Sequence, residues 1–577
     1  RMFLLVMCTV LLFAPGAFAE SSDGIWLPMQ EASINRTAAP RLIVPSNYRT
    51  FRLQRHLLEA LLAQVPMERD VAAQRSVHTL SLPLPDGSYG KFRIVESPIM
   101  EAELAAKFPQ IRTWSGQGID EPSATVRFDL TPSGFHAQIL SWQGSVFIDP
   151  YQRDDTENYI SYHKRDVMRA EPMICSVTGQ EIPADLPNFQ KRGMTPKVSS
   201  GTRFRTYRLA VAATGEYTAF HGGTVPLGLA AIVTTVNRVN AIYERDLATR
   251  MLLVANNNVL IYTNAGSDPY TNNDGFAMLA ENQSNVTTQI GAANYDVGHV
   301  VSTGGGGVAG LGVVCSNTQK ARGVTGSPAP VGDPFDVDYV AHEIGHQFGG
   351  NHTFNSTSGS CGDGNRNAST AYEVGSGITI QAYAGICSPS NVQNNSSDYF
   401  HRASLNEMLA FIGSTACPVD TASGNTPPTV STDPAFTIPA RTPFELTATG
   451  SDGNGDALTY IWEQFNLGVE ANAPITDNGS SPIFRNFSPT TSPSRVFPRL
   501  PDLLAGVTPA YEILPTTSRT LNFRVTARDN RANAGGTNEA STALTVIGSA
   551  GPFVVTAPNT AVTWLDASNQ NITWNVA

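Results

Sequence analysis

The hydrophobic pattern changes its period several times along the chain, and each change predicts a different kind of element. Residues 51–64 repeat leucine at helical spacing, which predicts an amphipathic helix. Residues 124–130 and 135–140 instead alternate apolar and polar side chains, as strands with one buried face do. A basic stretch with Pro and Ser at 190–200 is typical of an exposed linker. We therefore predict a separate domain of mixed helix and strand over residues 20–200.

A second unit is predicted over residues 201–423, where strands and helices alternate. A long amphipathic helix begins after Thr224, which is a typical cap, and Pro226 lies in its first turn. Ser404 and Glu407 have the spacing of a capping box, which predicts that the last helix starts at Ser404. The predicted strands of this unit cover residues 206–212, 251–255, 259–263 and 298–302.

The composition shifts to Thr, Ser, Pro and Asn after Cys417, and short alternating segments separated by turn residues follow. This pattern predicts an Ig-like β-sandwich over residues 424–548. Residues 549–577 begin a further β module and stop in the middle of its pattern. Because the chain also begins at Arg1 rather than at a methionine, we expect it to be a fragment.

The first residues have the pattern of a secretory signal. Arg1 supplies a positive charge, residues 2–13 are apolar, and residues 17–19 (Ala-Phe-Ala) have the form of a cleavage site. The alternative is a membrane anchor, but a bilayer span requires roughly 18 to 20 apolar residues, and no later stretch reaches that length. We therefore assign residues 1–19 to a signal peptide and expect a secreted, extracellular bacterial protein with no membrane span after signal removal.

Composition limits the classes of function. The chain has 577 residues, which is too long for one hydrophobic core and so predicts several domains. Charged residues make up 15% of the sequence and the formal net charge is -11, so we expect no basic surface for nucleic acid. The sequence leaves the oligomeric state unknown.

The segment 342–352, His-Glu-Ile-Gly-His-Gln-Phe-Gly-Gly-Asn-His, carries the strongest chemical signal. His342 and His346 lie four residues apart, so on a helix both imidazoles reach one ion from the same face. Gly349 permits the left-handed turn that brings His352 back as a third ligand. Three neutral ligands leave a fourth position for water, which is the arrangement of a catalytic Zn²⁺ site.

Glu343 follows the first of these histidines and can act beside the metal without binding it. A carboxylate in that place takes the proton from the attacking water and passes it to the leaving amine. The sequence therefore predicts a zinc-dependent peptide hydrolase with Glu343 as its general base.

The motif His-Glu-x-x-His-x-x-Gly-x-x-His at 342–352 resembles the metzincin clan of zinc proteases. Its surroundings are most similar to the reprolysin-like branch found in secreted bacterial proteins, and the resemblance covers residues 201–420. It implies an α+β domain with a twisted mixed sheet and helices in an upper half, and the third ligand and a tight Met-turn in a lower half. It also implies a bound Zn²⁺ and protein or peptide substrates.

Two positions depart from the pattern of this family. The Met-turn falls at residues 378–385, where Gln381 stands in place of the methionine, so a buried amide must find a partner. Thr353 follows the third histidine, where reprolysins usually carry Asp. Tyr383 matches a position at which some metzincins place a tyrosine that stabilises the oxyanion. The alternative for Tyr383 is a side chain that only packs in the turn.

Cys175 lies in the sequence Pro-Met-Ile-Cys-Ser-Val at 172–177, which resembles the Pro-x-x-Cys-x-Val cysteine switch of reprolysin prodomains. A thiolate is a good zinc ligand. Bound at the open position, it would keep a precursor latent until cleavage near residues 191–192. The alternative is an unpaired structural or intermolecular cysteine.

The second unit carries four clustered cysteines, Cys315, Cys361, Cys387 and Cys417, as two disulfides in an oxidising compartment would require. Four cysteines allow three pairings, and their spacing does not choose among them. The reprolysin resemblance implies the pairs Cys315–Cys417 and Cys361–Cys387.

Two further segments carry weaker signals. Residues 305–310 match Gly-x-Gly-x-x-Gly, but we expect residues 311–315 to continue as β rather than as the helix of a dinucleotide site. We interpret this segment as the rim of the cleft, where an extended substrate adds to a sheet edge. Residues 452–456 (Asp-Gly-Asn-Gly-Asp) could bind Ca²⁺ through their oxygens, and a plain polar turn is the alternative.

These observations predict a secreted zinc endopeptidase made as a latent precursor, with residues 20–200 as its prodomain and the β modules as substrate, surface or export adaptors. Two rival hypotheses stay open. One is an inactive zinc-binding adhesion protein, and Gln381 is the feature that favours it. The other is a zinc hydrolase of a non-protein amide, against which a prodomain that blocks the site argues.

Overall fold

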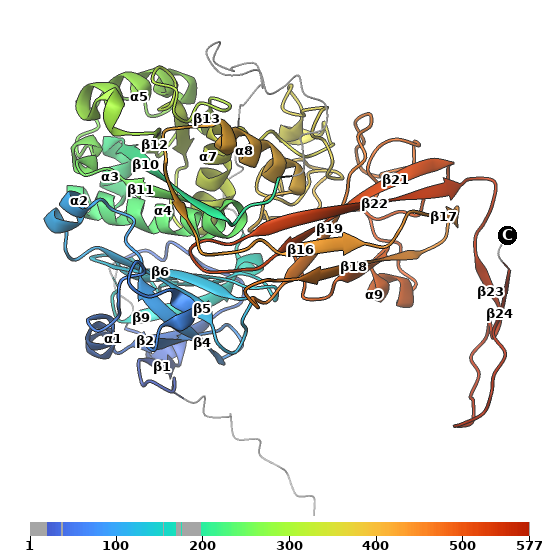
Figure 1. Cartoon of the computed structure of the whole chain (residues 1–577). Coiled ribbons are helices and arrows are strands. Elements are labelled where there is room, and N and C mark those ends of the chain that lie inside the picture. Colours follow the sequence, from blue (N-terminus) through green and yellow to red (C-terminus); the bar gives the residue numbers. More distant parts are fainter. Residues whose placement is uncertain (1–19, 36–38, 154, 169–174, 176–197, 576–577) are drawn as a thin grey trace, which may run out of the picture.

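The computed structural model of the chain describes residues 20–35, 39–153, 155–168, 175 and 198–575, which form three packed units and a C-terminal hairpin (Figure 1). An N-terminal sheet comes first, a central α+β unit follows, and a β-sandwich packs beside the central unit. The predicted signal peptide at 1–19 and the predicted cleavage region at 191–192 lie outside the described residues.

The N-terminal unit is a nine-stranded antiparallel sheet with two short helices, α1 (Arg55–Leu62) and α2 (Ala102–Lys107). Its strand order is β1-β2-β9-β8-β7-β6-β5-β4-β3. The predicted strands at 124–130 and 135–140 are confirmed as β6 and β7. The strands are β1 (Trp26–Met29), β2 (Arg49–Leu53), β3 (Thr79–Pro83), β4 (Tyr89–Glu96), β5 (Arg112–Gly118), β6 (Thr125–Thr131), β7 (Gly134–Leu140), β8 (Val146–Pro150) and β9 (Asn158–His163).

The predicted helix at 51–64 is wrong in its first part. Residues 49–53 form β2, in which Phe51 pairs with Tyr159 of β9 and is buried. The helix begins only at Arg55. Phe51 and Leu53 also fit the two-residue period of a strand, and pairing with two neighbouring strands decides between the two periods.

The central unit is built on a mostly parallel sheet with the order β11-β10-β12-β14-β13, and β15 pairs with β10. Strand β13 lies at one end of this order and runs antiparallel to β14. The strands are β10 (Arg203–Ala213), β11 (Thr249–Leu253), β12 (Val297–Ser302), β13 (Gly307–Ala309), β14 (Gly323–Gly326) and β15 (Val419–Ala422). The helices are α3 (Gly215–Phe220), α4 (Val225–Leu247), α5 (Gly275–Ile290), α6 (Asp333–Phe335), α7 (His342–Gln347) and α8 (Arg402–Ser414).

The predicted long helix is confirmed as α4, which lies between the central sheet and the N-terminal sheet (Figure 1). The Thr224 hydroxyl caps it by accepting the Leu227 amide N–H at 3.4 Å. By length and composition α4 is apolar enough to cross a membrane, so the expectation that no later stretch reaches that length is wrong. In this fold its apolar side chains pack in the core of the central unit.

The predicted strand at 259–263 is wrong. Residues 257–260 form a short 3₁₀ helix, and Ile261 makes an isolated bridge to Ala213 of β10. Residues 311–315, which we expected to continue as β, form turns. Both segments are short apolar runs, whose state is decided by their neighbours rather than by their own pattern.

The predicted start of α8 at Ser404 is also wrong. The helix begins at Arg402, and His401 caps it by accepting the Ala403 amide N–H on Nδ1 at 3.1 Å. Glu407 does not close a capping box but accepts hydrogen bonds from Asn351. Glu407 therefore makes a tertiary contact with Asn351 instead of the local hydrogen bond that a capping box requires.

The C-terminal unit is a sandwich of two sheets, β16-β18-β20 and β17-β22-β21-β19, around one apolar core. Four phenylalanines of that core, Phe444, Phe484, Phe497 and Phe523, contact one another. The elements are β16 (Thr429–Thr432), β17 (Phe436–Pro439), β18 (Phe444–Ser451), β19 (Thr459–Gln464), β20 (Ser494–Phe497), α9 (Leu500–Leu504), β21 (Arg519–Arg528) and β22 (Thr537–Ile547). A hairpin of β23 (Val554–Ala557) and β24 (Thr573–Asn575) follows.

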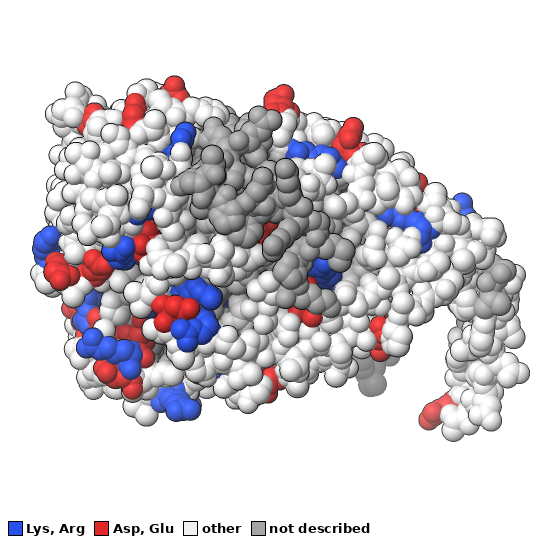
Figure 2. All heavy atoms as spheres, turned by 45° about the horizontal axis from the view of Figure 1, so that its top comes forward, with Lys and Arg blue, Asp and Glu red and all other residues white. Residues whose placement is uncertain are grey.

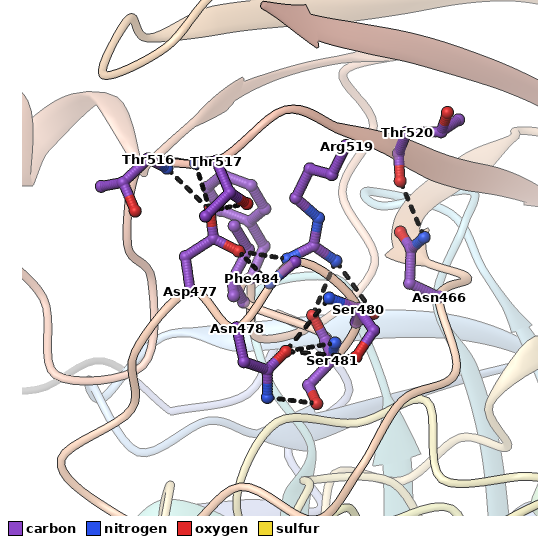
Figure 3. A network of polar contacts seen from close by, with 12 residues as sticks. Asn466, Asp477, Asn478, Ser480, Ser481, Phe484, Thr516, Thr517, Arg519 and Thr520 are labelled. Carbon is purple, nitrogen blue, oxygen red and sulfur yellow. Dashed lines mark hydrogen bonds and ion pairs between the residues drawn. The ribbon is translucent and has the colours of Figure 1, made fainter. Parts of the chain in front are cut away.

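The long connection between β19 and β20 is fixed to the sandwich by polar contacts (Figure 3). Asp477 accepts a hydrogen bond from Arg519 at 2.7 Å and another from the Thr516 amide at 2.7 Å. Burial by itself would raise the pKa of Asp477, but these donors and the Gly479 amide lower it to about 2. The carboxylate is therefore charged at neutral pH and holds the connection in place.

Buried ion pairs join the N-terminal sheet to α4. Arg127 of β6 contacts Glu244 of α4 at 2.6 Å, and Arg238 of α4 contacts Asp149 of β8 at 2.6 Å. All four side chains are almost fully buried. These pairs make α4 a shared element of both units.

Lys164 of the N-terminal unit enters an acidic pocket of the central unit. Its ammonium lies 2.8 Å from Asp333, 2.8 Å from Asp338 and 2.5 Å from Asp398. Burial alone would lower the pKa of Lys164, but the three carboxylates raise it above its ordinary value. Lys164 therefore forms a buried, charged contact between the two units.

The sandwich is joined to the central unit in the same way. Arg528 of β21 contacts Asp246 of α4 at 3.0 Å, and both side chains are buried. Ser200, just before β10, exchanges two main-chain hydrogen bonds with Thr537 at the start of β22. The sandwich thus holds the beginning of the central unit.

Charged side chains on the face drawn in Figure 2 are few and of mixed sign. Acidic and basic groups lie side by side in small clusters, and broad areas between them are uncharged. The described residues of this face therefore form no extended surface that is all acidic or all basic.

Candidate active site

Three imidazoles of the segment 342–352 converge on one point. His342 and His346 lie on α7, and their Nε2 atoms are 3.0 Å apart. His352 follows in a loop and places its Nε2 3.1 Å from that of His346. Zinc–nitrogen bonds of about 2.0–2.1 Å separate two tetrahedral nitrogen ligands by about 3.3 Å. The three nitrogens therefore fit around one ion.

The Nδ1 atom of each ring contacts a main-chain carbonyl, which fixes the ring. The contacts are His342 to Ile380 at 2.6 Å, His346 to Gly350 at 2.7 Å and His352 to Asn365 at 2.6 Å. A proton held on Nδ1 leaves the Nε2 lone pair for a metal. Burial and the neighbouring imidazoles lower the pKa of His352 to about 3 and that of His346 well below its ordinary value, so these rings are neutral.

The turn after α7 brings the third histidine back. Gly349 has a φ of 89°, the left-handed conformation that glycine adopts without strain, and its amide N–H donates to His346 O at 2.8 Å. Glu407 of α8 then accepts the Asn351 amide N–H at 2.9 Å. These contacts fix the residues that lead into His352.

Glu343 occupies space that Gly307 of β13 leaves open. A Cβ atom on Gly307 would lie 2.0 Å from Glu343 Oε1. Burial raises the pKa of Glu343 to about 8, and a contact with the Cys175 thiol offsets part of this rise. The carboxylate therefore lies between the sheet edge and the metal position.

Cys175 lies at the fourth corner of the histidine site. Its Sγ is 3.8 Å from His346 Nε2 and 3.7 Å from His352 Nε2. The sulfur and the three nitrogens all lie within 4.8 Å of one another. Bonds of about 2.3 Å to sulfur and 2.0–2.1 Å to nitrogen give a tetrahedral S–N separation of about 3.6 Å. The four atoms thus match a tetrahedral zinc site.

Residues 202–410 match the family model described as metallo-peptidase family M12B, reprolysin-like. The central unit is therefore similar to reprolysin-like metallopeptidases. Members of this family generally use zinc and hydrolyse peptide bonds. The match includes the histidine site and excludes the N-terminal sheet and the sandwich. A comparison with curated proteins gave no match.

Tyr383 lies against the ligands of the metallopeptidase domain. Its ring centroid is 4.6 Å from that of His352 and 5.7 Å from that of His342. Its hydroxyl donates a hydrogen bond to Cys175 O at 2.9 Å. The tyrosine therefore packs in the turn, as one interpretation expected, and also presents its hydroxyl next to the metal position.

Gln381 lies against α7. Its Nε2 is 3.2 Å from His346 Nδ1 and 3.3 Å from Gly350 O, so it shares the carbonyl that already orients His346. Its Oε1 has no hydrogen-bond partner among the described residues. A Cβ atom on residue Gly345 would lie 2.3 Å from that Oε1. The glycine thus leaves room for the amide, which is only partly hydrogen-bonded.

Thr353 stands where reprolysins usually carry Asp, and it contacts Glu373. Sequence patterns did not single out Glu373. The Thr353 hydroxyl donates to Glu373 at 2.6 Å, and the same buried carboxylate accepts the Ile378 amide N–H at 2.7 Å. It also accepts the Thr379 hydroxyl. Glu373 therefore ties the loop after His352 to the start of the turn that carries Gln381. No motif in the sequence marks this glutamate.

The four clustered cysteines form the disulfides Cys315–Cys417 and Cys361–Cys387, which are the pairs that the reprolysin resemblance implied. The second disulfide lies in a small apolar cluster with Cys175 and Tyr383. It therefore supports the side of the site on which Cys175 lies.

The possible calcium segment at 452–456 lies far from the histidine site in sequence, at the turn between β18 and β19. Asp452 and Asp456 come together there with a third carboxylate, Asp529, which the sequence analysis did not single out. Asp529 follows β21 and is separated from the turn by more than 70 residues, so no local motif links them.

Proposed function

We propose that this chain is a zinc endopeptidase made as a latent, exported precursor. The observation that carries the proposal is the convergence of three histidines and Cys175 beside the carboxylate of Glu343. The reprolysin-like match over residues 202–410 supports the same class of enzyme.

His342, His346 and His352 would hold Zn²⁺ through their Nε2 atoms. When bound, the ion supplies a Lewis acid that polarises a peptide carbonyl and lowers the pKa of water. The carbonyl contacts on the three Nδ1 atoms keep the rings oriented and in the tautomer that binds metal.

Glu343 is the general base in this proposal. Its carboxylate takes a proton from the attacking water and delivers it to the nitrogen of the departing amine. The space left by Gly307 places the carboxylate next to β13, so the proton acceptor lies close to a peptide bound at that edge.

Strand β13 is the edge to which we assign the substrate. It is the last strand of the central sheet, and an extended peptide can add to such an edge by main-chain hydrogen bonds. Cys175 forms a bridge to Gly307 on the same strand. A substrate and the Cys175 segment therefore compete for this edge.

Tyr383 assists the attack on the substrate carbonyl in this proposal. Its hydroxyl donates to the Cys175 carbonyl in the latent form. Once that carbonyl is replaced by substrate, the same hydroxyl donates to the oxygen that becomes negatively charged during attack.

Latency depends on the Cys175 thiolate at the fourth corner of the metal site, where it excludes the attacking water. Cleavage of the chain between Cys175 and β10 then allows the thiol to leave. Two disulfides in the central unit support synthesis for an oxidising compartment.

Digestion of a peptide library by the processed, zinc-loaded protein tests the proposed function. Cleavage at internal bonds, mapped by mass spectrometry and abolished by chelation, is the expected result. Removal of terminal residues only would contradict endopeptidase activity. Zinc binding without any cleavage would favour the adhesion protein instead.

Substitution Cys175→Ala tests latency. Without the sulfur ligand the fourth corner is open to water, so the unprocessed variant should cleave a peptide that the unprocessed wild type does not. We expect a rate increase of about 10²-fold or more, because the thiol excludes the water on which the reaction depends.

The control is the processed form of each protein, in which the two rates should agree. If the unprocessed Cys175→Ala protein stays inactive while its processed form works, Cys175 is not the latch.

A further inference from the structure

Three carboxylates meet at the junction of the sandwich with the rest of the molecule. Asp452 and Asp456 lie in the turn after β18, and Asp529 follows β21. One oxygen from each of them lies within 4.8 Å of the others. Calcium–oxygen distances of 2.3–2.6 Å place ligands on opposite sides of one ion up to about 5 Å apart. The spacing thus fits a single ion.

The negative charge of this group exceeds the positive charge around it. Arg531 contacts Asp456 at 3.2 Å and is the one cation paired with the three carboxylates among the described residues. Asp529 is only 1% exposed. Asp529 accepts hydrogen bonds from the Asn425 side chain and from the Arg531 and Gly536 amides, but these donors are uncharged, so the three carboxylates share the charge of a single cation among the described residues.

A buried amide beside the carboxylates points to a ligand independently of them. Asn425, in the linker before β16, is 6% exposed, and its Nδ2 donates hydrogen bonds to Asp529 Oδ2 at 2.6 Å and to Ala534 O at 2.9 Å. Its Oδ1 is buried and has no hydrogen-bond partner among the described residues. The Asp452 Oδ2 atom is likewise buried and has no hydrogen-bond partner among the described residues. A cation bound here would compensate the partial or full negative charge of these two oxygens.

We propose that Asp452, Asp456, Asp529 and the oxygen of Asn425 bind one Ca²⁺ ion. Every donor is a hard oxygen, which Ca²⁺ and Mg²⁺ prefer and Zn²⁺ does not require. The donors come from three separate segments without octahedral regularity, and Asp456 is 18% exposed, which leaves room for water ligands. Such an irregular site favours Ca²⁺ over Mg²⁺, which demands near-ideal geometry.

The proposed ion would stabilise the arrangement of all three units. The loop that follows Asp529 donates an amide N–H from Ala532 to Gln117 of the N-terminal sheet at 2.8 Å. It donates another from Gly535 to the Glu244 carbonyl of α4 at 2.9 Å. Fixing Asp529 to the linker and to the turn therefore also fixes the contacts of this loop with both other units.

Calorimetric titration of the full chain with CaCl₂ tests the proposal, with MgCl₂ as the comparison. The protein carries Glu343→Ala to prevent self-digestion and is saturated with zinc. We expect one saturable site, half-occupied at about 10⁻⁴ to 10⁻³ M as in extracellular calcium modules, and a rise in Tm over the same range. Absence of saturable binding, or an equal response to Mg²⁺, would overturn the proposal.

Matched variants locate the site. Asp452→Asn keeps the Oδ1 acceptor of the Asn454 and Asp456 amides but removes the charge, so it should weaken binding at least tenfold. Asp502→Asn changes a half-buried carboxylate on α9 that pairs with Arg499 and should leave binding unchanged.

A third variant should change the calcium affinity in the opposite direction. Arg531→Gln removes the competing guanidinium and should tighten binding. Wild-type affinity in Asp452→Asn would show that the ion binds elsewhere. Because Asp529→Asn loses contacts to main-chain amides and can fail to fold, Asp452→Asn decides the question.

Discussion

At the scale of single residues, Gln381 departs from the metzincin pattern that the segment 342–352 resembles. The amide lies against α7, at the position where the resemblance implied a methionine, and Gly345 leaves space for it. One end of the amide lies near Gly350 O, and the other has no hydrogen-bond partner among the described residues. The substitution therefore leaves a buried polar atom whose cost the surrounding structure must offset.

Substitution Gln381→Met should raise the free energy of unfolding by about 1 kcal/mol, since an unsatisfied buried carbonyl costs about 1–3 kcal/mol and methionine has a similar volume. Zinc affinity should not fall. Denaturant unfolding of the zinc-free protein measures the first effect, and a competitive chelator titration measures the second.

Gln381→Ala is the control, because it removes the same amide but leaves a cavity and should destabilise by about 2 kcal/mol or more. A loss of stability or zinc affinity in Gln381→Met would mean that the amide orients His346 rather than merely filling space.

At the scale of elements, α4 connects the metallopeptidase domain to both of its neighbours. Its last turn carries Asp246, which Arg528 of β21 contacts at 3.0 Å. Burial alone would raise the pKa of Asp246, but Arg245 and Arg528 lower it to about 2. The sandwich is thus joined to the central unit by a charge that remains ionised well below neutral pH.

This lowered pKa predicts a pH dependence of stability. The unfolded carboxyl titrates near pH 3.9 and the folded one near 2, so the stabilisation is present above about pH 4 and is lost as the pH falls towards 2. It amounts to about 2 kcal/mol. Asp246→Asn should therefore show a smaller loss of stability between pH 4 and pH 2 than the wild type, measured on zinc-free protein.

Equal pH slopes in the two proteins would contradict the assignment. At pH 7 the same variant should be less stable by about 3–5 kcal/mol, because it leaves the buried Arg528 without its carboxylate.

Elements set by local pattern were predictable from the sequence, and elements set by distant contacts were not. The helix after Thr224 and the strands β6, β7, β10 and β12 follow from their periodicity. Residues 259–263 have the same kind of apolar run, but the segment holds only the end of a 3₁₀ helix and an isolated bridge from Ile261 to β10.

The candidate site likewise has a part that the sequence predicted and a part that it did not. Spacing within 342–352 predicted the meeting of three histidines, because a helix and one glycine turn produce it. The carbonyls that orient the rings come from Ile380 and Asn365, and the acidic anchor is Glu373. These residues meet the histidines only through the folded loops, so no local pattern reveals them.

At the scale of the whole molecule, the N-terminal unit is held on the metallopeptidase domain by buried charges as well as by Cys175. Lys164 contacts three carboxylates of the central unit, and Arg127 and Arg238 add further buried pairs. We therefore expect the N-terminal unit to stay bound after the connecting chain is cut. Release then requires a second event beyond cleavage.

Substitution Lys164→Met tests this expectation. It removes the ammonium that three buried carboxylates share, which should lower the free energy of unfolding by about 3–5 kcal/mol. After cleavage the N-terminal unit should separate from the variant in gel filtration and co-elute with the wild type.

Lys107→Met is the matched control, since Lys107 is an exposed lysine at the same boundary that donates to Ala255 O at 3.2 Å. Its effect should be below about 0.5 kcal/mol. Separation of the cleaved wild type would show that the covalent connection, rather than the ion pairs, holds the units together.

The central claim is that the histidine site hydrolyses peptide bonds with Glu343 as base, and kcat/KM of processed Glu343→Gln at full zinc occupancy tests it most directly. Glutamine keeps the shape and the metal ligands but cannot accept the proton, so kcat/KM should fall by about 10²- to 10⁴-fold with zinc content unchanged. Wild-type kcat/KM in a zinc-loaded Glu343→Gln protein would contradict the account.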